Sequence, residues 1–549
     1  MLKIIPLGGL GEIGLNMMLL EYGDSMLVID AGIMFPGDYT PGVDIIIPDF
    51  CFLKQQRDRI KGIILTHGHE DHIGAVPFLL KEINAPVYGT GFTLDLLKEK
   101  LRDYNLLGKS ELRYVKAGEI SHIEPFQIEY INVSHSIVDG VGLAIETPEG
   151  IIVHSGDFKI EHSSVGSEGT DIARFAFYGK KGVLALLSDS TNAEKRGFSL
   201  TERQVRETLE GIFSKSKGRI IVASFATNIP RIQQIVSLAA QFKRKVLFMG
   251  RNMLLAVSIA RKRGFIDIPH DVEINERQLP LYKDSELVII TTGTQGEPMS
   301  ALVRMAHSAY RYVKIKPGDT IILSSKFIPG NEVAITSIIN TLYKLGANVI
   351  YETVADIHAS GHAKREELKL MLSLVRPKYF IPIHGEYRHL VKHSQLAMDM
   401  GVPKENIMLL EDGDVVVCKD GICWKNDKIP TGKVLIDGKG MGDIEDITLK
   451  DRKKLSIHGM VIVVLVTDER TGDIIYGPDV MSKGFILQGY RDYLLEDAKC
   501  VILEVFDDLD RSGSINWGSV EAEIKKRLKG FFYSVMRKDP LIVPIIIHL

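Results

Sequence analysis

The feature that most constrains this chain is a cluster of histidines and acids directly after a short apolar run. The cluster is Thr66–His72, with the sequence THGHEDH, and the run before it is Gly62–Leu65. A buried strand followed by an irregular segment lets side chains converge at the strand's carboxyl end. Imidazole and carboxylate groups together suit zinc or manganese, so this pattern predicts one metal site or two adjacent ones rather than a loop whose histidines face water. The predicted ligands are His67, His69, Asp71 and His72.

Length and composition limit what this cluster can belong to. A chain of 549 residues predicts two to four domains, and 45% hydrophobic with 25% charged residues is ordinary for a globular protein. A net charge of -3 excludes an overall basic nucleic-acid coat but permits a local basic groove. We find no signal-peptide pattern and no membrane-spanning run, and therefore expect a cytoplasmic protein. The scattered cysteines predict reduced thiols without disulfides; they are Cys51, Cys418, Cys423 and Cys500.

A glycine-rich segment near the N-terminus fits the dinucleotide-binding fingerprint only in part. Gly9–Gly14 has the G-x-G-x-x-G spacing, but that fingerprint requires a helix directly afterwards. The residues that follow, Asn16–Tyr22 and Met26–Asp30, instead predict two strands around a Gly-Asp turn. We therefore expect no dinucleotide site here.

Two further ligand candidates and a change of pattern follow along the chain. His135 and Asp157 each end a predicted strand. From about Thr201 to Tyr351, helical and strand patterns alternate regularly, which predicts a parallel sheet covered by helices. His384 then ends another predicted strand.

Strand-end His and Asp residues after H-x-H-x-D-H resemble the metallo-β-lactamase superfamily. The resemblance implies two β-sheets sandwiched between helices, with a two-metal site along one edge. It implies that one metal is held by three histidines, the second by Asp71 and His72, and that Asp157 bridges them. The three histidines are His67, His69 and His135. His384 is the candidate for the remaining ligand, which implies that the chain returns to the first domain after an insertion.

The insertion and its flanks resemble the β-CASP branch of this superfamily, whose members process nucleic acids. The segments that match its three motifs are Ser188–Ala193, Ser360–His362 and Pro382–Glu386. Within this branch, the whole chain is similar to the bacterial ribonuclease J family. The segments that carry this similarity are Gly8–Gly14, Ser224–Asn228, Thr292–Glu297 and His358–His362.

The expected fold class is α/β: a metallo-β-lactamase αββα sandwich, an inserted parallel α/β β-CASP domain and a small C-terminal α/β domain. We place the first part of the sandwich at residues 1–203, the insertion at 204–362 and the second part at 363–426. A linker is expected at 427–453 and the C-terminal domain at 454–549. In the last domain we expect strands at Met460–Thr467 and Val501–Phe506.

The resemblance also implies roles for individual side chains. Asp71 would orient a water or take its proton, and His362 would contact a phosphate oxygen or assist the leaving oxygen. Ser224 and Asn228 would line a pocket for the RNA terminus. Asp44 and Asp437 would hold a structural cation. The residues that would cradle backbone phosphate are His358, Ala359, Ser360, Gly361 and His362. The alternative for this last loop is an ordinary strand-to-helix turn capped by serine.

The expected function is a metal-dependent ribonuclease in RNA maturation and mRNA decay. It would act 5′ to 3′ on 5′-monophosphate RNA and also cut internally. We expect two divalent ions per subunit, zinc first, with manganese or magnesium as alternatives. The expected partners are single-stranded RNA, further copies of the chain in a homodimer or homotetramer, and an RNA-degradation complex or paralogous subunit. A basic run, Lys243–Arg263, is a candidate RNA-binding rail, although it equally fits a solvated helix face.

Two alternatives belong to other classes. A small-molecule metallo-hydrolase, of the thioesterase or lactonase type, has no use for the inserted domain. A non-catalytic RNA-binding subunit predicts damaged ligands, whereas every predicted ligand is intact.

Overall fold

The structure is a computed structural model of the chain. It describes residues 1–37, 40–161, 169–295, 300–326, 331–438, 446–484, 491–508 and 515–549. Two compact units form: Met1–Phe35 with Ile45–Val434, and Pro36–Asp44 with Leu435–Leu549. Among the described residues, none of the helices is both long enough and apolar enough to cross a membrane.

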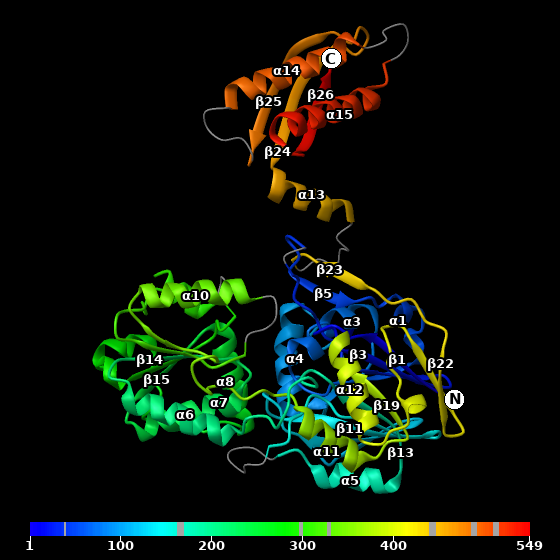
Figure 1. The fold of residues 1–549 in the computed structure, drawn as a ribbon, viewed down its shortest axis with the longest axis vertical. Helices are drawn as coiled ribbons and strands as arrows, with labels where there is room; N and C mark the ends of the chain where they lie inside the picture. The colour runs from blue at the N-terminus through cyan, green and yellow to red at the C-terminus, as the bar shows by residue number, and fades with distance from the viewer. Residues whose placement is uncertain are drawn as a thin grey trace. The chain divides into compact units, whose positions relative to one another are not determined.

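The first unit contains two sheets that pack face to face, coloured blue to cyan and yellow in Figure 1. The eight-stranded sheet has the order β22 (Ile422–Asn426), β21 (Val415–Lys419), β1 (Leu2–Gly8), β3 (Met17–Tyr22), β4 (Ser25–Ile29), β6 (Ile60–Ile64), β7 (Val87–Thr90) and β8 (Leu112–Val115). The six-stranded sheet has the order β19 (Tyr379–Ile383), β13 (Val183–Asp189), β12 (Gly150–His154), β11 (Gly140–Thr147), β10 (Phe126–Val133) and β9 (Ile120–Ile123).

One core joins these sheets, because the alternate residues of each point inward. Leu20, Leu27 and Ile64 of the first sheet share a buried cluster with Leu143 and Ile152 of the second. Helices cover the outer faces: α3 (Val76–Glu82), α4 (Gly91–Asp103), α5 (Ile172–Lys181), α11 (Arg365–Val375) and α12 (Tyr387–Asp399). The predicted αββα sandwich is confirmed.

The glycine-rich N-terminal segment is a strand connection and not a helix start. β3 and β4 pair antiparallel, with Met18 opposite Ile29, as the sequence predicted. Gly14 has φ +104°, and a Cβ there would lie 2.9 Å from the carbonyl oxygen of Ile33. Glycine is thus required by backbone packing and not by a dinucleotide.

The inserted domain is a five-stranded sheet in which every pairing is parallel, as predicted, and its helices surround the green sheet in Figure 1. Its order is β15 (Lys245–Met249), β16 (Leu287–Thr291), β14 (Ile220–Ala223), β17 (Thr320–Leu323) and β18 (Asn348–Ile350). Its helices are α6 (Glu202–Lys215), α7 (Ile229–Gln241), α8 (Arg251–Arg263), α9 (Ala301–Ala306) and α10 (Glu332–Lys344). This sheet lies within the first unit, so the boundaries near residues 204 and 362 stay predictions.

The C-terminal unit is a three-stranded sheet, ordered β25 (Ile474–Lys483), β24 (Met460–Thr467) and β26 (Leu541–His548). Two helices, α14 (Arg491–Asp507) and α15 (Trp517–Met536), cover one face of it. The predicted strand Val501–Phe506 is wrong, because these residues form the last part of α14. Ile502, Val505 and Phe506 are buried at helical spacing, and a short apolar run does not by itself distinguish helix from strand.

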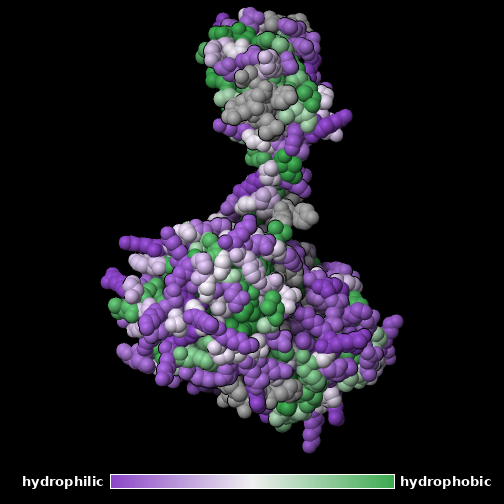
Figure 2. Space-filling view, turned by 60° about the vertical axis from the view of Figure 1, so that its left-hand side comes forward, coloured by the Kyte–Doolittle hydropathy of each residue, from purple (hydrophilic) through white to green (hydrophobic). Residues whose placement is uncertain are grey.

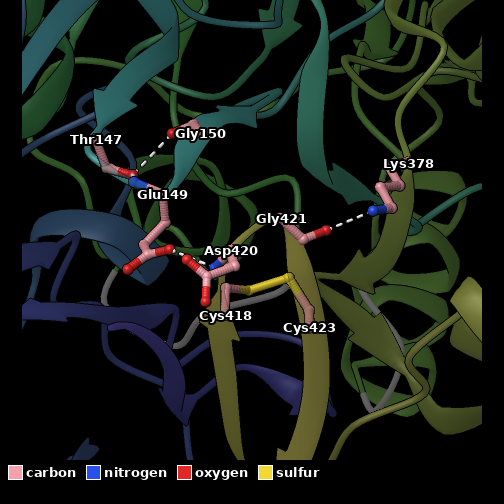
Figure 3. The surroundings of a disulfide bond; sticks show 8 residues. All are labelled: Thr147, Glu149, Gly150, Lys378, Cys418, Asp420, Gly421 and Cys423. Carbon is pink, nitrogen blue, oxygen red and sulfur yellow. Dashed lines mark hydrogen bonds between the residues drawn. A yellow bond between two sulfur atoms is a disulfide. The ribbon is translucent and has the colours of Figure 1, made fainter.

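The expectation of reduced cysteines is also wrong for one pair. Cys418 on β21 and Cys423 on β22 lie directly opposite in an antiparallel hairpin and form a disulfide (Figure 3). The turn between them is held by neighbours, since the Asp420 amide donates to Glu149 and the Lys378 ammonium donates to the Gly421 carbonyl. The spacing of the two cysteines along the chain does not by itself indicate that a hairpin places their thiols opposite each other. Cys51 and Cys500 are both exposed and take no part in this disulfide.

Candidate metal centre

The histidine cluster is anchored to the end of strand β4. Asp30, which directly follows β4 and has φ +61°, accepts hydrogen bonds of 2.8 Å from both the amide and the hydroxyl of Thr66. The second half of the cluster forms a short helix, α2 (Glu70–Ile73), against the turn at Gly32. A Cβ on Gly32 would lie 1.6 Å from the Asp71 carbonyl oxygen, so only glycine lets α2 pack there.

Three histidines form the first donor group: His67, His69 and His135. His69 Nδ1 lies 3.1 Å from His67 Nε2 and 3.1 Å from His135 Nε2. Nitrogen ligands on a tetrahedral zinc are about 3.3 Å apart, given Zn–N bonds of about 2.0–2.1 Å. The group therefore matches the spacing of a zinc coordination sphere.

The second donor group is Asp71, His72, Asp157 and His384. Asp157 Oδ2 lies 3.3 Å from His72 Nε2 and 3.4 Å from His384 Nε2. The same oxygen lies 3.7 Å from His67 Nε2, so Asp157 faces both groups. A cavity of about 20 Å³ beside this group has room for one water-sized particle. The residues thus fit two adjacent cations that share Asp157.

Other side chains fix the orientation of these ligands. His72 Nδ1 contacts Asp30 Oδ2 at 2.8 Å, which leaves Nε2 facing Asp157. His135 Nδ1 contacts the Gly361 carbonyl at 2.7 Å, which leaves Nε2 facing His69. Such outer partners hold each imidazole in the tautomer and direction that a metal requires.

The electrostatics favour metal binding at the first group. Burial lowers the pKa of His67 and His135 well below the usual value and that of His69 to about 4. These rings are therefore neutral at neutral pH and can bind a cation. Burial alone would raise the pKa of Asp157, but His384 and His72 hold it well below its usual range, so its carboxylate is charged.

A further pair adjoins the metal ligands. His362 Nδ1 contacts Asp189 Oδ2 at 2.8 Å and lies 3.8 Å from Asp157 Oδ2. Asp189 belongs to the motif segment Ser188–Ala193, but no role was predicted for it. Asp30 was not among the predicted site residues. Both acids could have been found from the sequence by their position at a strand end, which they share with the predicted ligands. Asp189 is the last residue of β13, and Asp30 directly follows β4.

Four family models match the chain in order. They are the metallo-β-lactamase superfamily at 10–168, the ribonuclease J β-CASP domain at 217–342, the Zn-dependent metallo-hydrolase RNA specificity domain at 346–409 and the ribonuclease J C-terminal domain at 447–549. Ribonuclease J2 of Bacillus subtilis is 39% identical over 100% of this chain and 98% of its own length.

The chain belongs to the ribonuclease J family. Ribonuclease J 1 of Streptococcus pyogenes is 39% identical over 99% of this chain and 97% of its own. Ribonuclease J of Helicobacter pylori is 42% identical over 89% of this chain and 71% of its own. A crystal structure of a protein of unknown function from Enterococcus faecalis has the same fold, with a TM-score of 0.53, 16% identity and coverage of 75% of this chain and 99% of that one.

In this ribonuclease J family member, the loop expected to bind phosphate lies against the candidate metal ligand His135. Gly361 packs on His135 so closely that a Cβ would lie 2.6 Å from its ring. Ser360 Oγ accepts a 2.7 Å hydrogen bond from Asn192, and α11 begins only after Lys364, so Ser360 is no helix cap. Burial lowers the pKa of His358 to about 3, and its Nδ1 is without a hydrogen-bond partner among the described residues. Phosphate binding by His358, Ala359, Ser360, Gly361 and His362 stays a prediction.

The residues predicted for the terminal pocket and for the structural cation also have partners within the protein for some of their polar atoms. Asn228 caps α7, since its Oδ1 accepts from the Arg231 amide, yet its Nδ2 and the Ser224 hydroxyl are buried without partners among the described residues. In the second unit, Asp44 accepts from the Gly438 amide. Asp437 pairs with Arg452 at 2.6 Å. The terminal pocket and the structural cation stay predictions.

Proposed function

We propose that this chain is a metal-dependent ribonuclease that degrades single-stranded RNA from its 5′ end, prefers a 5′-monophosphate and also cuts internally. The observation that carries the proposal is the meeting of two donor groups at Asp157, directly beside the Asp189–His362 pair. This arrangement places cation ligands beside an imidazole, that of His362, which can exchange a proton with the substrate. Metal-assisted hydrolysis of a phosphodiester uses both kinds of group. RNA maturation and mRNA decay in the cytoplasm is the matching role.

In this proposal, different residues of the chain bind the ions, activate the water and contact the phosphate. Two bound divalent ions, zinc first and manganese or magnesium as alternatives, would lower the pKa of a water and offset charge on the phosphoryl group. Asp71 has 31% of its side chain accessible and can orient that water or take its proton. His362 presents Nε2 to substrate while Asp189 holds its Nδ1, so it can contact a phosphate oxygen or give a proton to the leaving oxygen.

Specificity for the terminus would come from buried polar atoms that lack partners. Ser224 Oγ, Asn228 Nδ2 and His358 Nδ1 have none among the described residues, and buried polar groups normally do. A 5′-monophosphate supplies acceptor oxygens for such groups. A triphosphate adds bulk and charge to the same pocket, and we therefore expect it to enter poorly.

The test uses one RNA with 5′-monophosphate, 5′-triphosphate or 5′-hydroxyl ends, followed in time with zinc, manganese or magnesium. We expect early release of mononucleotides, fastest from the monophosphate. His362→Ala should slow cleavage by about 10²–10⁴-fold without loss of metal, whereas His122→Ala, on exposed β9, should change neither. Equal rates for the three ends, with internal fragments as the only products, would overturn the 5′-exonuclease part of the proposal and identify an endonuclease. Rapid hydrolysis of a thioester or lactone without RNA cleavage would overturn the proposal.

Assembly into a homodimer or homotetramer is part of the same proposal. One face of the C-terminal sheet is covered by α14 and α15, and on the other face the residues of β24 and β26 are apolar and partly open to solvent. Paired residues on that face are Ile462 with Val543, Val464 with Ile545, and Val466 with Ile547. Hydrophobic residues reach the surface of this unit in Figure 2. A second copy of the chain is the partner we propose for this face, and an RNA-degradation complex or paralogous subunit is a further partner.

A further inference from the structure

Three lysines from three different loops meet beside the His358–His362 loop. Lys195 follows β13, Lys326 follows β17 and Lys364 directly precedes α11. The ammonium groups of Lys195 and Lys326 are in contact, and the charge of Lys364 reaches Lys195. The backbone connects the group to the loop, since the Arg365 amide donates to the Lys195 carbonyl at 3.0 Å.

Like charges in contact are unfavourable unless something offsets them. The three ammonium groups form no ion pair with a described carboxylate, and the acid whose charge reaches Lys195 is the exposed Glu352. Burial and the charge of Lys326 lower the pKa of Lys195 to about 8. Burial does most to lower the pKa of His358 and His389, and the charge of Lys326 adds to this effect at both rings.

Several other basic groups of the chain already have partners within the protein. Lys159 lies between Glu161 and Glu202. Two arginines of the predicted RNA rail are engaged in the same way: Arg261 pairs with Glu273, and Arg263 pairs with Asp95. Arg244 in the same run donates to backbone carbonyls and is buried. The lysine group differs from these cations, because its like charges lie close together and none of the three forms an ion pair with a described carboxylate.

We propose that Lys195, Lys326 and Lys364 bind a backbone phosphate of the RNA, next to the phosphate that enters the His358–His362 loop. A phosphodiester supplies one negative charge and acceptor oxygens for ammonium donors drawn from three directions. The contact is independent of base identity, as a nuclease that moves along RNA requires. This inference rests on the proposed ribonuclease function and adds a substrate-binding group to it.

The test measures binding without turnover. Fluorescence anisotropy of a labelled single-stranded RNA, with the full chain in EDTA, gives Kd at a series of KCl concentrations. We expect Lys195→Gln and Lys326→Gln each to weaken binding about tenfold. The slope of log Kd against log salt should fall by about 0.7 for each lysine removed. Lys195→Arg should retain most of the affinity, and Lys180→Gln, on an exposed part of α5, should match wild type.

A second arm separates this inference from the ribonuclease function. With metals present, both Gln variants should raise KM for RNA and leave kcat nearly unchanged, and thermal unfolding should show an intact fold. Wild-type affinity and salt slope in both variants, while wild type cleaves RNA, would overturn the lysine site alone. Weaker binding of a free nucleoside monophosphate with unchanged RNA affinity would also overturn it. No RNA binding or cleavage by wild type would overturn the ribonuclease function itself.

Discussion

The guanidinium of Arg231 donates a hydrogen bond of 2.6 Å to the carbonyl oxygen of Ile357, the residue directly before His358. Arg231 is fully buried and also donates to Ser324 Oγ at 2.7 Å and to Glu202 at 2.9 Å. The inserted domain thus holds the loop that faces the metal ligands by a buried, charged group. A buried cation of this kind is stabilising only while its partners remain.

Replacing Arg231 by Met should therefore be costly, because Glu202 and the Ile357 carbonyl lose a buried partner. We expect a loss of about 3–5 kcal/mol in the free energy of unfolding and a higher KM for RNA from the loosened loop. Urea unfolding and steady-state kinetics measure both. The matched control is Arg203→Met, whose exposed pair with Glu207 should contribute less than about 1 kcal/mol. Equal stability of the two variants would show that the Arg231 network is not a stabilising element.

The same network predicts a pH dependence. Burial acts to raise the pKa of Glu202, but Arg231 and Lys159 lower it from 4.5 to about 2. Because the folded pKa lies below the unfolded one, the stabilisation is fully present above about pH 5 and is lost as pH falls toward 2. That loss is about 3 kcal/mol. Unfolding free energies between pH 7 and 3 should fall less steeply for Glu202→Gln than for wild type; parallel curves would contradict the assignment.

The donor residues of the candidate metal centre could be grouped from the sequence because they follow strands, and strand ends meet at one edge of the fold. Asp30 lies at an equivalent strand end, yet nothing local shows that it will contact His72, a residue 42 positions later. Long-range contacts of this kind depend on the sheet order, here β4 beside β6. Resemblance located Asp189 within a motif, but only the fold shows its contact with His362.

The errors have equally local causes. Val501–Phe506 is a short apolar run, and such a run can be buried either in a helix or in a strand. Its secondary structure therefore depends on the elements that pack against it. The disulfide forms because the register of the β21–β22 hairpin places Cys418 opposite Cys423. The two cysteines do not determine that register by themselves. Parallel pairing in the inserted sheet, in contrast, followed from alternation over many residues and needed no register.

The donor geometry makes a direct prediction about metal content. His67 faces both His69 and Asp157, so His67→Ala removes one of the three nitrogen donors of the first group. Elemental analysis should find up to two zinc or manganese ions in wild type and fewer in the variant, with RNA hydrolysis abolished. His122→Ala should leave metal content and activity unchanged, since His122 is exposed on β9. Full metal occupancy in His67→Ala would remove the basis of the site.

The last prediction concerns the open face of the C-terminal sheet. Ile545 is 44% exposed and lies beside Val464 on that face. If a second copy covers it, Ile545→Lys buries an unpaired charge at the contact and should shift a dimer or tetramer toward monomer. Val535→Lys is the control: it also replaces an exposed apolar residue, 56% accessible, but one on α15, the helix that covers the other face. Deletion after Lys450 should have the same effect as Ile545→Lys while metal content persists. Light scattering that gives one mass for wild type, Ile545→Lys and the deletion would show that this face does not mediate assembly.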